Sequence, residues 1–133
     1  MIYVTRKEHF SSSHTLNNTV LSADKNEKLF GKCNNFHGHN YNMEVTVCGE
    51  PDKLSGYVID LKLLKNIIQE EIIDKVDHKF LNDLEMFKGI IPTTENLVVK
   101  FWEILENKIK QENSRLYSIK LFETEKNCVY YKG

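Results

Sequence analysis

The chain has 133 residues, of which 41% are hydrophobic and 28% are charged, and its formal net charge is −1. These values fit one soluble globular domain over residues 1–133. They provide neither the basic field of a nucleic-acid-binding protein nor an apolar run long enough to cross a bilayer. Three cysteines without framework spacing, and a first segment without an apolar signal-peptide core, argue against a secreted domain. We therefore expect a cytoplasmic protein with no nucleic-acid and no membrane partner.

The first half of the chain predicts two strands and a long loop between them. Residues 2–13 are rich in β-branched, aromatic and hydroxyl side chains, which are typical of a strand. Residues 15–36 are polar and show no periodicity, so we expect a loop there. Residues 37–48 alternate between apolar and polar side chains, which predicts a second strand. The apolar face of this second strand consists of Tyr41, Met43, Val45 and Val47.

The second half predicts two helices and then two strands. Asp60 is a suitable N-cap for a helix whose apolar stripe is Leu61, Leu64, Ile68 and Ile72. A second helix is expected to begin near residues 92–95, where hydroxyl caps precede an acid in the first turn. The remaining expected features are the stripe Val98, Phe101, Trp102, Leu105 and Ile109, and a hairpin of strands at residues 115–124 and 127–132.

The order ββααββ predicts an α+β fold, with an antiparallel sheet and both helices on one face. The other face of the sheet is then expected to carry apolar residues that no helix covers. Such a surface usually finds a partner, so the pattern also predicts an oligomer.

The strongest local signal is His37-Gly38-His39, at the start of the second predicted strand. Side chains two residues apart on a strand point to the same face, so these two imidazoles lie together. His14 ends the first strand, which is expected to pair with the second, so three histidines converge. Three imidazoles suit zinc and leave one tetrahedral position open, as in catalytic sites. The alternative is three separate surface or hydrogen-bonded histidines.

Cys33 stands four residues before His37, among polar neighbours and close to the expected cation. A nearby positive charge favours the thiolate, which acts as a base or a nucleophile. The alternative is a small buried hydrophobe, which is the interpretation we give to Cys48 and Cys128 in their strands.

Asp77 and His78 follow the first predicted helix in a short polar loop. A carboxylate can orient an imidazole and support its protonated form in a proton relay. Adjacent residues on an extended chain point apart, so an intimate pair requires a special backbone conformation. Without one, the two residues are a solvated loop pair.

Glu123 shares its parity with Tyr117, Ile119 and Leu121, so it is predicted to continue an apolar strand face. A buried carboxylate is costly unless it finds hydrogen-bond partners. A ligand with adjacent N–H donors would provide them. The alternative is a glutamate at the strand end, already in solvent.

These residues occur, in order, within motifs of one known family. Over nearly its whole length the chain resembles the 6-pyruvoyltetrahydropterin synthases. The matching motifs are Ser11-Ser12-Ser13-His14, the segment from Leu29 to Asn35, His37-Gly38-His39-Asn40-Tyr41, Asp77-His78-Lys79, Thr93-Thr94-Glu95-Asn96 and Glu123-Thr124.

The resemblance implies a role for each candidate residue. It implies that the three histidines hold zinc and that Cys33 is the proton-abstracting thiolate. Asp77 and His78 would relay protons, and Glu123 would anchor the pterin ring and also take part in the relay. The residues implied to contact the pterin at the start of the second helix are Thr93 and Thr94.

The resemblance also implies the tunnelling fold, in which trimers close their sheets into a barrel and two trimers stack into a homohexamer. Sites in this family lie between subunits, so Cys33 and His78 of one site would come from different chains.

The implied reaction is the zinc-dependent conversion of 7,8-dihydroneopterin triphosphate to 6-pyruvoyltetrahydropterin and triphosphate, in tetrahydrobiopterin biosynthesis. Three residues separate Cys33 from His37, and this spacing resembles that of bacterial 6-carboxytetrahydropterin synthases of the queuosine pathway. Residues 29–35, however, resemble the animal 6-pyruvoyl branch. The alternatives are therefore the 6-carboxy product, a pterin- or zinc-binding protein without catalysis, and a plain structural zinc domain.

Overall fold

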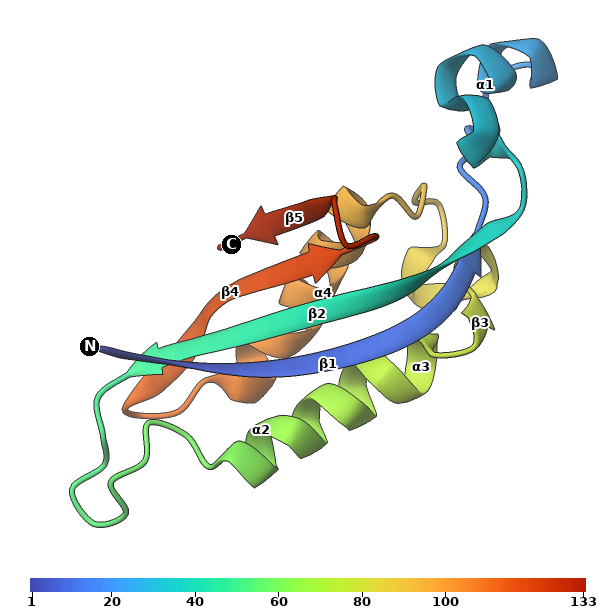
Figure 1. Cartoon of the computed structure of the whole chain (residues 1–133). Helices are drawn as coiled ribbons and strands as arrows, with labels where there is room; N and C mark the ends of the chain where they lie inside the picture. Colours follow the sequence, from blue (N-terminus) through green and yellow to red (C-terminus); the bar gives the residue numbers. More distant parts are fainter.

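The computed structural model describes residues 1–133 (Figure 1). No helix in it is both long and apolar enough to span a bilayer. The strands and helices are β1 (Ile2–His14), α1 (Ala23–Phe30), β2 (His37–Gly49), α2 (Leu61–Ile68), α3 (Asp74–Val76), β3 (Lys79–Phe80), α4 (Thr94–Ile109), β4 (Ser114–Phe122) and β5 (Cys128–Tyr131).

The sheet has five strands in the order β3-β1-β2-β4-β5. The four predicted strands are present and pair antiparallel, and β1 pairs with β2 along its whole length, from Ile2 opposite Gly49 to His14 opposite His37. The two-residue strand β3 was not predicted. It pairs parallel to β1 at Ser12 and Ser13, so the sheet is mixed rather than purely antiparallel.

Helices α2, α3 and α4 cover one face of the sheet, as predicted (Figure 1). The apolar face of β2 is fully buried against them, and so is the predicted stripe of α4. Asp60 caps α2 by accepting a hydrogen bond from the Lys62 N–H. Leu61 was predicted to belong to the buried stripe of α2 but is 55% exposed, at the first residue of the helix, whereas Leu64 is fully buried.

The segment predicted as a loop, residues 15–36, contains helix α1 and a 3-10 turn at Gly31–Asn34. Hydrophobic periodicity does not reveal α1, because side-chain hydrogen bonds stabilise it instead of an apolar stripe. Ser22 caps its first turn, and the buried amide of Asn26 donates to the carbonyls of Asn18 and Ser22. Figure 1 shows α1 beyond the end of the β1–β2 pair.

A β-bulge in β4 changes the faces of its residues. Thr46 lies opposite Ser118 and Val47 opposite Leu116, so Tyr117 is an extra residue in the ladder. Tyr117 therefore turns to the uncovered face and packs against Tyr3, with ring centroids 4.7 Å apart. The prediction that Tyr117 lies on the same apolar face as Ile119 and Leu121 was therefore wrong.

The face of the sheet away from the helices is mainly polar but carries the aromatic pair Tyr3 and Tyr117, so the expectation of uncovered apolar residues holds only in part. A Thr5–Thr46 hydroxyl pair and a Lys7–Glu44 ion pair lie on it. From Tyr41 to Val47 the apolar residues of β2 point to the helices, because they alternate with polar residues. The open feature of this sheet is its edge, since β1 has a strand partner on only one side from Ile2 to Ser11.

Candidate active site

Three imidazoles lie together where β1 ends and β2 begins. The register places His14 opposite His37 and Ser12 opposite His39, so all three rings reach the helix-covered face. Their ring centroids are 4.5–5.2 Å apart, and one nitrogen of each ring lies within 4.8 Å of those of the other two. The convergence expected from strand pairing is therefore present.

Backbone carbonyls orient two of these rings. His14 Nδ1 is 2.8 Å from the Pro92 oxygen, and His37 Nδ1 is 2.6 Å from the Asn35 oxygen. Each Nδ1 then carries the proton, which leaves Nε2 free as a metal ligand. The Nε2 atoms of His14 and His39 are buried without a hydrogen-bond partner. This donor set fits a metal ion bound by three neutral imidazoles.

Burial also keeps the rings neutral. It lowers the pKa of His14 by more than the hydrogen bond to the Pro92 carbonyl raises it. Burial likewise lowers the pKa of His39, against the carboxylate of Glu123, which raises it. Neutral imidazole is the form that binds metal, so burial favours the required state of His14 and His39.

Glu123 lies immediately after β4, beside the first turn of α4. Thr94 Oγ1 donates a 2.6 Å hydrogen bond to Glu123 Oε2, and His39 Nε2 is 3.7 Å from Glu123 Oε1. The glutamate side chain is 26% exposed. Glu123 was predicted to continue the strand face, but the strand ends one residue earlier, and Thr94 holds the carboxylate in place.

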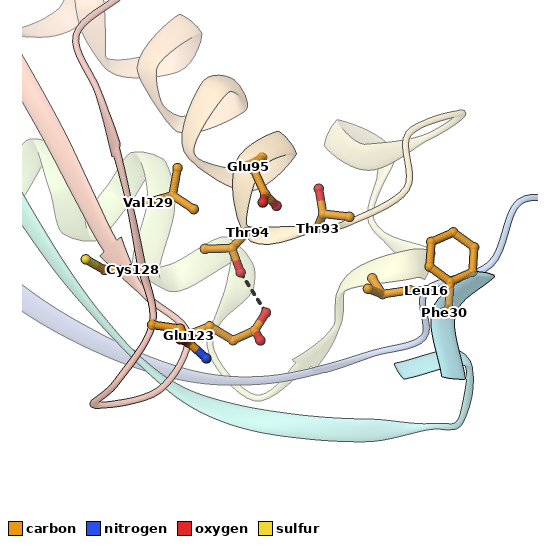
Figure 2. Close-up of a pocket in the computed structure, with 9 residues that line it drawn as sticks. Leu16, Phe30, Thr93, Thr94, Glu95, Glu123, Cys128 and Val129 are labelled. Carbon is orange, nitrogen blue, oxygen red and sulfur yellow. Dashed lines mark hydrogen bonds between the residues drawn. The ribbon is translucent and has the colours of Figure 1, made fainter. Parts of the chain in front are cut away.

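A pocket of about 380 Å³ opens beside this carboxylate (Figure 2). Its volume is in the range of small-molecule sites, roughly 300–1,000 Å³. Thr93, Thr94 and Glu123 were predicted to contact a ligand, and all three line it. Sequence reasoning did not single out the other lining residues as ligand contacts, although Phe30 and Glu95 lie within the family motifs. These residues are Leu16, Phe30, Glu95, Asn127, Cys128 and Val129.

The start of α4 supports one side of the pocket. The Thr93 hydroxyl accepts a hydrogen bond from the Asn96 N–H and caps the helix, as predicted. Thr94, in the first turn, is buried and turns its hydroxyl to Glu123. A carboxylate is favoured at this position because the helix dipole is positive at its N-terminus.

Asp77 and His78 form an intimate pair. His78 Nδ1 is 2.9 Å from Asp77 Oδ2, which is possible because His78 has a left-handed backbone with φ of 58°. The other oxygen of Asp77 accepts the Ser11 N–H at 2.9 Å. The Ser11 N–H and then His78 lower the pKa of the Asp77 carboxyl. The His78 side chain is 83% exposed, at the outer edge of β1.

Cys33 and His78 do not line the pocket of Glu123 within one chain. Cys33 lies in the 3-10 turn after α1 and is exposed, and its carbonyl accepts the Leu16 N–H. Cys48 is buried, as expected. Cys128 was expected to be buried but is exposed and lines the pocket, because β5 is an edge strand.

The pocket shares Glu123 with the histidine cluster, since this carboxylate lines the pocket and faces His39. This arrangement is typical of an enzyme site for a small molecule rather than of a structural zinc site, whose four positions are all closed by protein atoms. Comparisons with known proteins agree with this class. A sequence profile described as "6-pyruvoyl tetrahydropterin synthase" matches residues 3–133. The chain belongs to the 6-pyruvoyl tetrahydropterin synthase family.

Individual relatives support the family over the full length of the match. The chain is 44% identical to the "6-pyruvoyl tetrahydrobiopterin synthase" of Dictyostelium discoideum, over 99% of this chain and 96% of the relative. It is also 44% identical to the human protein of that name, over 98% of this chain and 90% of the human protein. A "6-carboxy-5,6,7,8-tetrahydropterin synthase" from Rickettsia typhi is 30% identical, over 96% and 97%.

The fold has the same relatives. The structure of Caenorhabditis elegans 6-pyruvoyl tetrahydropterin synthase superposes with a TM-score of 0.91, at 39% identity, over 99% of this chain and 95% of the other. The resemblance drawn from the motifs and the predicted fold class are thereby confirmed.

Proposed function

We propose that this chain is a zinc-dependent lyase that converts 7,8-dihydroneopterin triphosphate to 6-pyruvoyltetrahydropterin and triphosphate. One observation carries the proposal: a carboxylate, Glu123, is fixed by Thr94 beside both an open pocket and the three histidines. The 44% identity to enzymes named for the 6-pyruvoyl product supports that product over the 6-carboxy product.

His14, His37 and His39 would hold the zinc ion. When bound, zinc supplies a Lewis acid that polarises substrate oxygens and stabilises developing negative charge. The protein prepares for this by hydrogen-bonding Nδ1 of His14 and His37 to carbonyl oxygens, so that each ring offers Nε2.

Glu123 would anchor the pterin. The 2-amino group and the N3–H of a pterin are adjacent donors, and a carboxylate accepts both in a bidentate pair. Thr94 fixes the carboxylate, and Thr93 and Thr94 form the wall of the pocket at the start of α4. This arrangement orients the pterin side chain relative to the histidines.

Cys33 would remove a proton from the substrate side chain, and the Asp77–His78 pair would return or relay protons. Asp77 is suited to hold His78, because one of its oxygens is fixed by Ser11 and the other faces His78 Nδ1. Neither Cys33 nor His78 lines the pocket of its own chain, which is consistent with sites built between subunits.

We therefore include a homohexamer of two stacked trimers in the proposal. The free edges of β1 and β5 support it, because an unpaired strand edge is a template for pairing with another chain. Three cysteines without a disulfide fit the reducing cytoplasm that we propose as its location.

Mass spectrometry of the products from 7,8-dihydroneopterin triphosphate tests the function. We expect 6-pyruvoyltetrahydropterin and triphosphate, and little product from the Cys33→Ala variant. A 6-carboxy product would instead support the alternative favoured by the spacing of Cys33 and His37. Binding of the pterin without turnover would indicate an inactive pterin-binding protein. Binding of zinc without binding of the pterin would indicate a structural zinc domain.

A further inference from the structure

The Tyr41 hydroxyl is buried without a hydrogen-bond partner. Four buried side-chain polar atoms share this condition: His14 Nε2, His39 Nε2, Tyr41 Oη and Ser114 Oγ. The first three belong to one cluster, since the Tyr41 ring centroid is 6.3 Å from that of His14 and 5.6 Å from that of His39. Ser114 lies at the opposite end of the sheet, beside Gly49.

The sheet and the core hold Tyr41 in this cluster. Tyr41 follows His37 and His39 on the same face of β2, and its side chain is fully buried. Its ring is stacked on Phe10, with centroids 4.8 Å apart and an interplanar angle of 13°. The ring is therefore fixed, and packing alone does not explain why it carries a hydroxyl, because phenylalanine would fill the same apolar contacts.

A buried hydroxyl without a partner destabilises the ligand-free protein, and buried polar groups in native structures nearly always find a partner. The neighbouring carboxylate of Glu123 does not accept from Tyr41: its Oε2 accepts from Thr94 and its Oε1 faces His39. The Nε2 atoms of His14 and His39 do not accept from Tyr41 either, since both lack a partner. The remaining candidate acceptor is a bound ligand between the histidines and Glu123.

We propose that Tyr41 Oη donates a hydrogen bond to a side-chain oxygen of the bound pterin. This inference rests on the proposed function. In the proposed binding mode Glu123 takes the donor edge of the pterin ring and the side-chain oxygens would lie next to His14 and His39. The Tyr41 ring packs against these two histidines. Tyr41 is then a substrate-contacting residue that distinguishes pterins by their side chains.

Calorimetric titration of the zinc-loaded protein with two probes tests the inference. The first probe is 7,8-dihydroneopterin, which has side-chain hydroxyls but no triphosphate leaving group. The second is 6-methyl-7,8-dihydropterin, which has the same ring and no side-chain oxygen. For Tyr41→Phe we expect about tenfold weaker binding of the first probe, the size of one lost hydrogen bond, and unchanged binding of the second.

The melting temperature of the ligand-free Tyr41→Phe protein should not fall, because the hydroxyl has no partner to lose, and its zinc content should match the parent. Ser114→Ala is the matched control, since it removes the other unpartnered hydroxyl and should change neither titration. Equal binding of dihydroneopterin by parent and Tyr41→Phe, or equal weakening of both probes, would overturn the inference. If the parent binds neither probe, the proposed function itself fails.

Discussion

Hydrogen bonds to single backbone carbonyls decide which nitrogen two of the three imidazoles present. The carbonyls of Pro92 and Asn35 take Nδ1 of His14 and His37, so both rings are fixed before any ion binds. His39 instead lies near Glu123, so the proposed metal ligands and the proposed pterin anchor share one electrostatic environment.

The metal content should depend on the cluster of His14, His37 and His39, and not on how many histidines the chain contains. We expect about one zinc per chain in the parent, and its loss in His37→Ala with the fold retained, because two imidazoles no longer complete the three-ligand set. His9→Ala, which removes an exposed histidine far along β1, is the control. Elemental analysis and circular dichroism measure both outcomes, and a zinc-free parent purified without chelators would remove the basis of the mechanism.

Binding and chemistry should separate between Glu123 and Cys33. A hydrogen bond to a charged group contributes about 1.5–3 kcal/mol, so Glu123→Gln should weaken pterin binding by roughly tenfold or more. Cys33→Ala should leave binding and zinc nearly intact and sharply lower turnover, since its proposed role is proton transfer. Calorimetry and steady-state kinetics compare them. Turnover near the parent rate in Cys33→Ala would mean that another group is the base.

Acid should destabilise the metal-free protein through the buried histidines. Burial lowers the pKa of His14 and of His39, whereas in the unfolded chain both bind protons near pH 6.5. The unfolded state therefore takes up more protons, and the free energy of unfolding should fall as the pH drops below about 6.5.

Melting temperatures measured with a chelator between about pH 8 and pH 5 test this dependence. His39→Asn should flatten the profile, and His9→Ala should leave it unchanged. If the melting temperature of the parent protein does not change over this pH range, the buried histidines do not control its acid stability.

Among the elements, α4 connects stability to the site. Its N-cap and its first turn are adjacent threonines with different tasks: Thr93 caps the helix, and Thr94 holds Glu123. The left-handed backbone at His78 has a comparable role at the end of α3, where it turns the imidazole toward Asp77. In both cases a helix terminus positions a side chain of the candidate site.

The two threonines should therefore give opposite results. Thr93→Ala should lower the free energy of unfolding by about 1 kcal/mol, as other lost caps do, with a smaller effect on pterin binding. Thr94→Val keeps the cap and the shape but releases Glu123, so it should weaken binding more than it lowers stability. Denaturant unfolding measures the stability of both variants, and calorimetry measures their pterin binding. If the two variants lose stability and binding to the same extent, Thr93 and Thr94 do not have separate roles.

For the whole molecule, the open sheet is the main structural fact. The polar face opposite the helices does not require an apolar partner, but the edges of β1 and β5 leave backbone donors and acceptors unpaired. In the hexamer that we propose, pairing between copies would satisfy them and would bring Cys33 and His78 of different chains to one pocket.

Light scattering should therefore give a mass near six times 15.6 kDa. A monomer at micromolar concentration would contradict the assembly. Mixing inactive Cys33→Ala chains with inactive His78→Ala chains should restore part of the activity, because some mixed interfaces then contain one intact site. Unmixed variants are the control, and no recovery after verified subunit exchange would place both residues in one chain's site.

The sequence by itself determined the features that depend on local pattern. The alternation of β2, the stripe and cap of α4 and the facing of His37 and His39 follow from periods of 2 and 3.6 residues and from capping chemistry. The position of His14 opposite His37 required only that consecutive strands pair. The motifs of the family were equally readable, because they are short and occur in order.

Only the tertiary structure decided the features that depend on contacts between distant residues. The bulge at Tyr117 changed the face on which parity had placed it, and Asn26 holds a polar helix where no periodicity marks one. Asp77 and His78 meet because Ser11, 66 positions from Asp77, fixes the carboxylate. Hydrogen bonds of this kind join side chains to the backbone of other segments, and no repeating pattern along the chain records them.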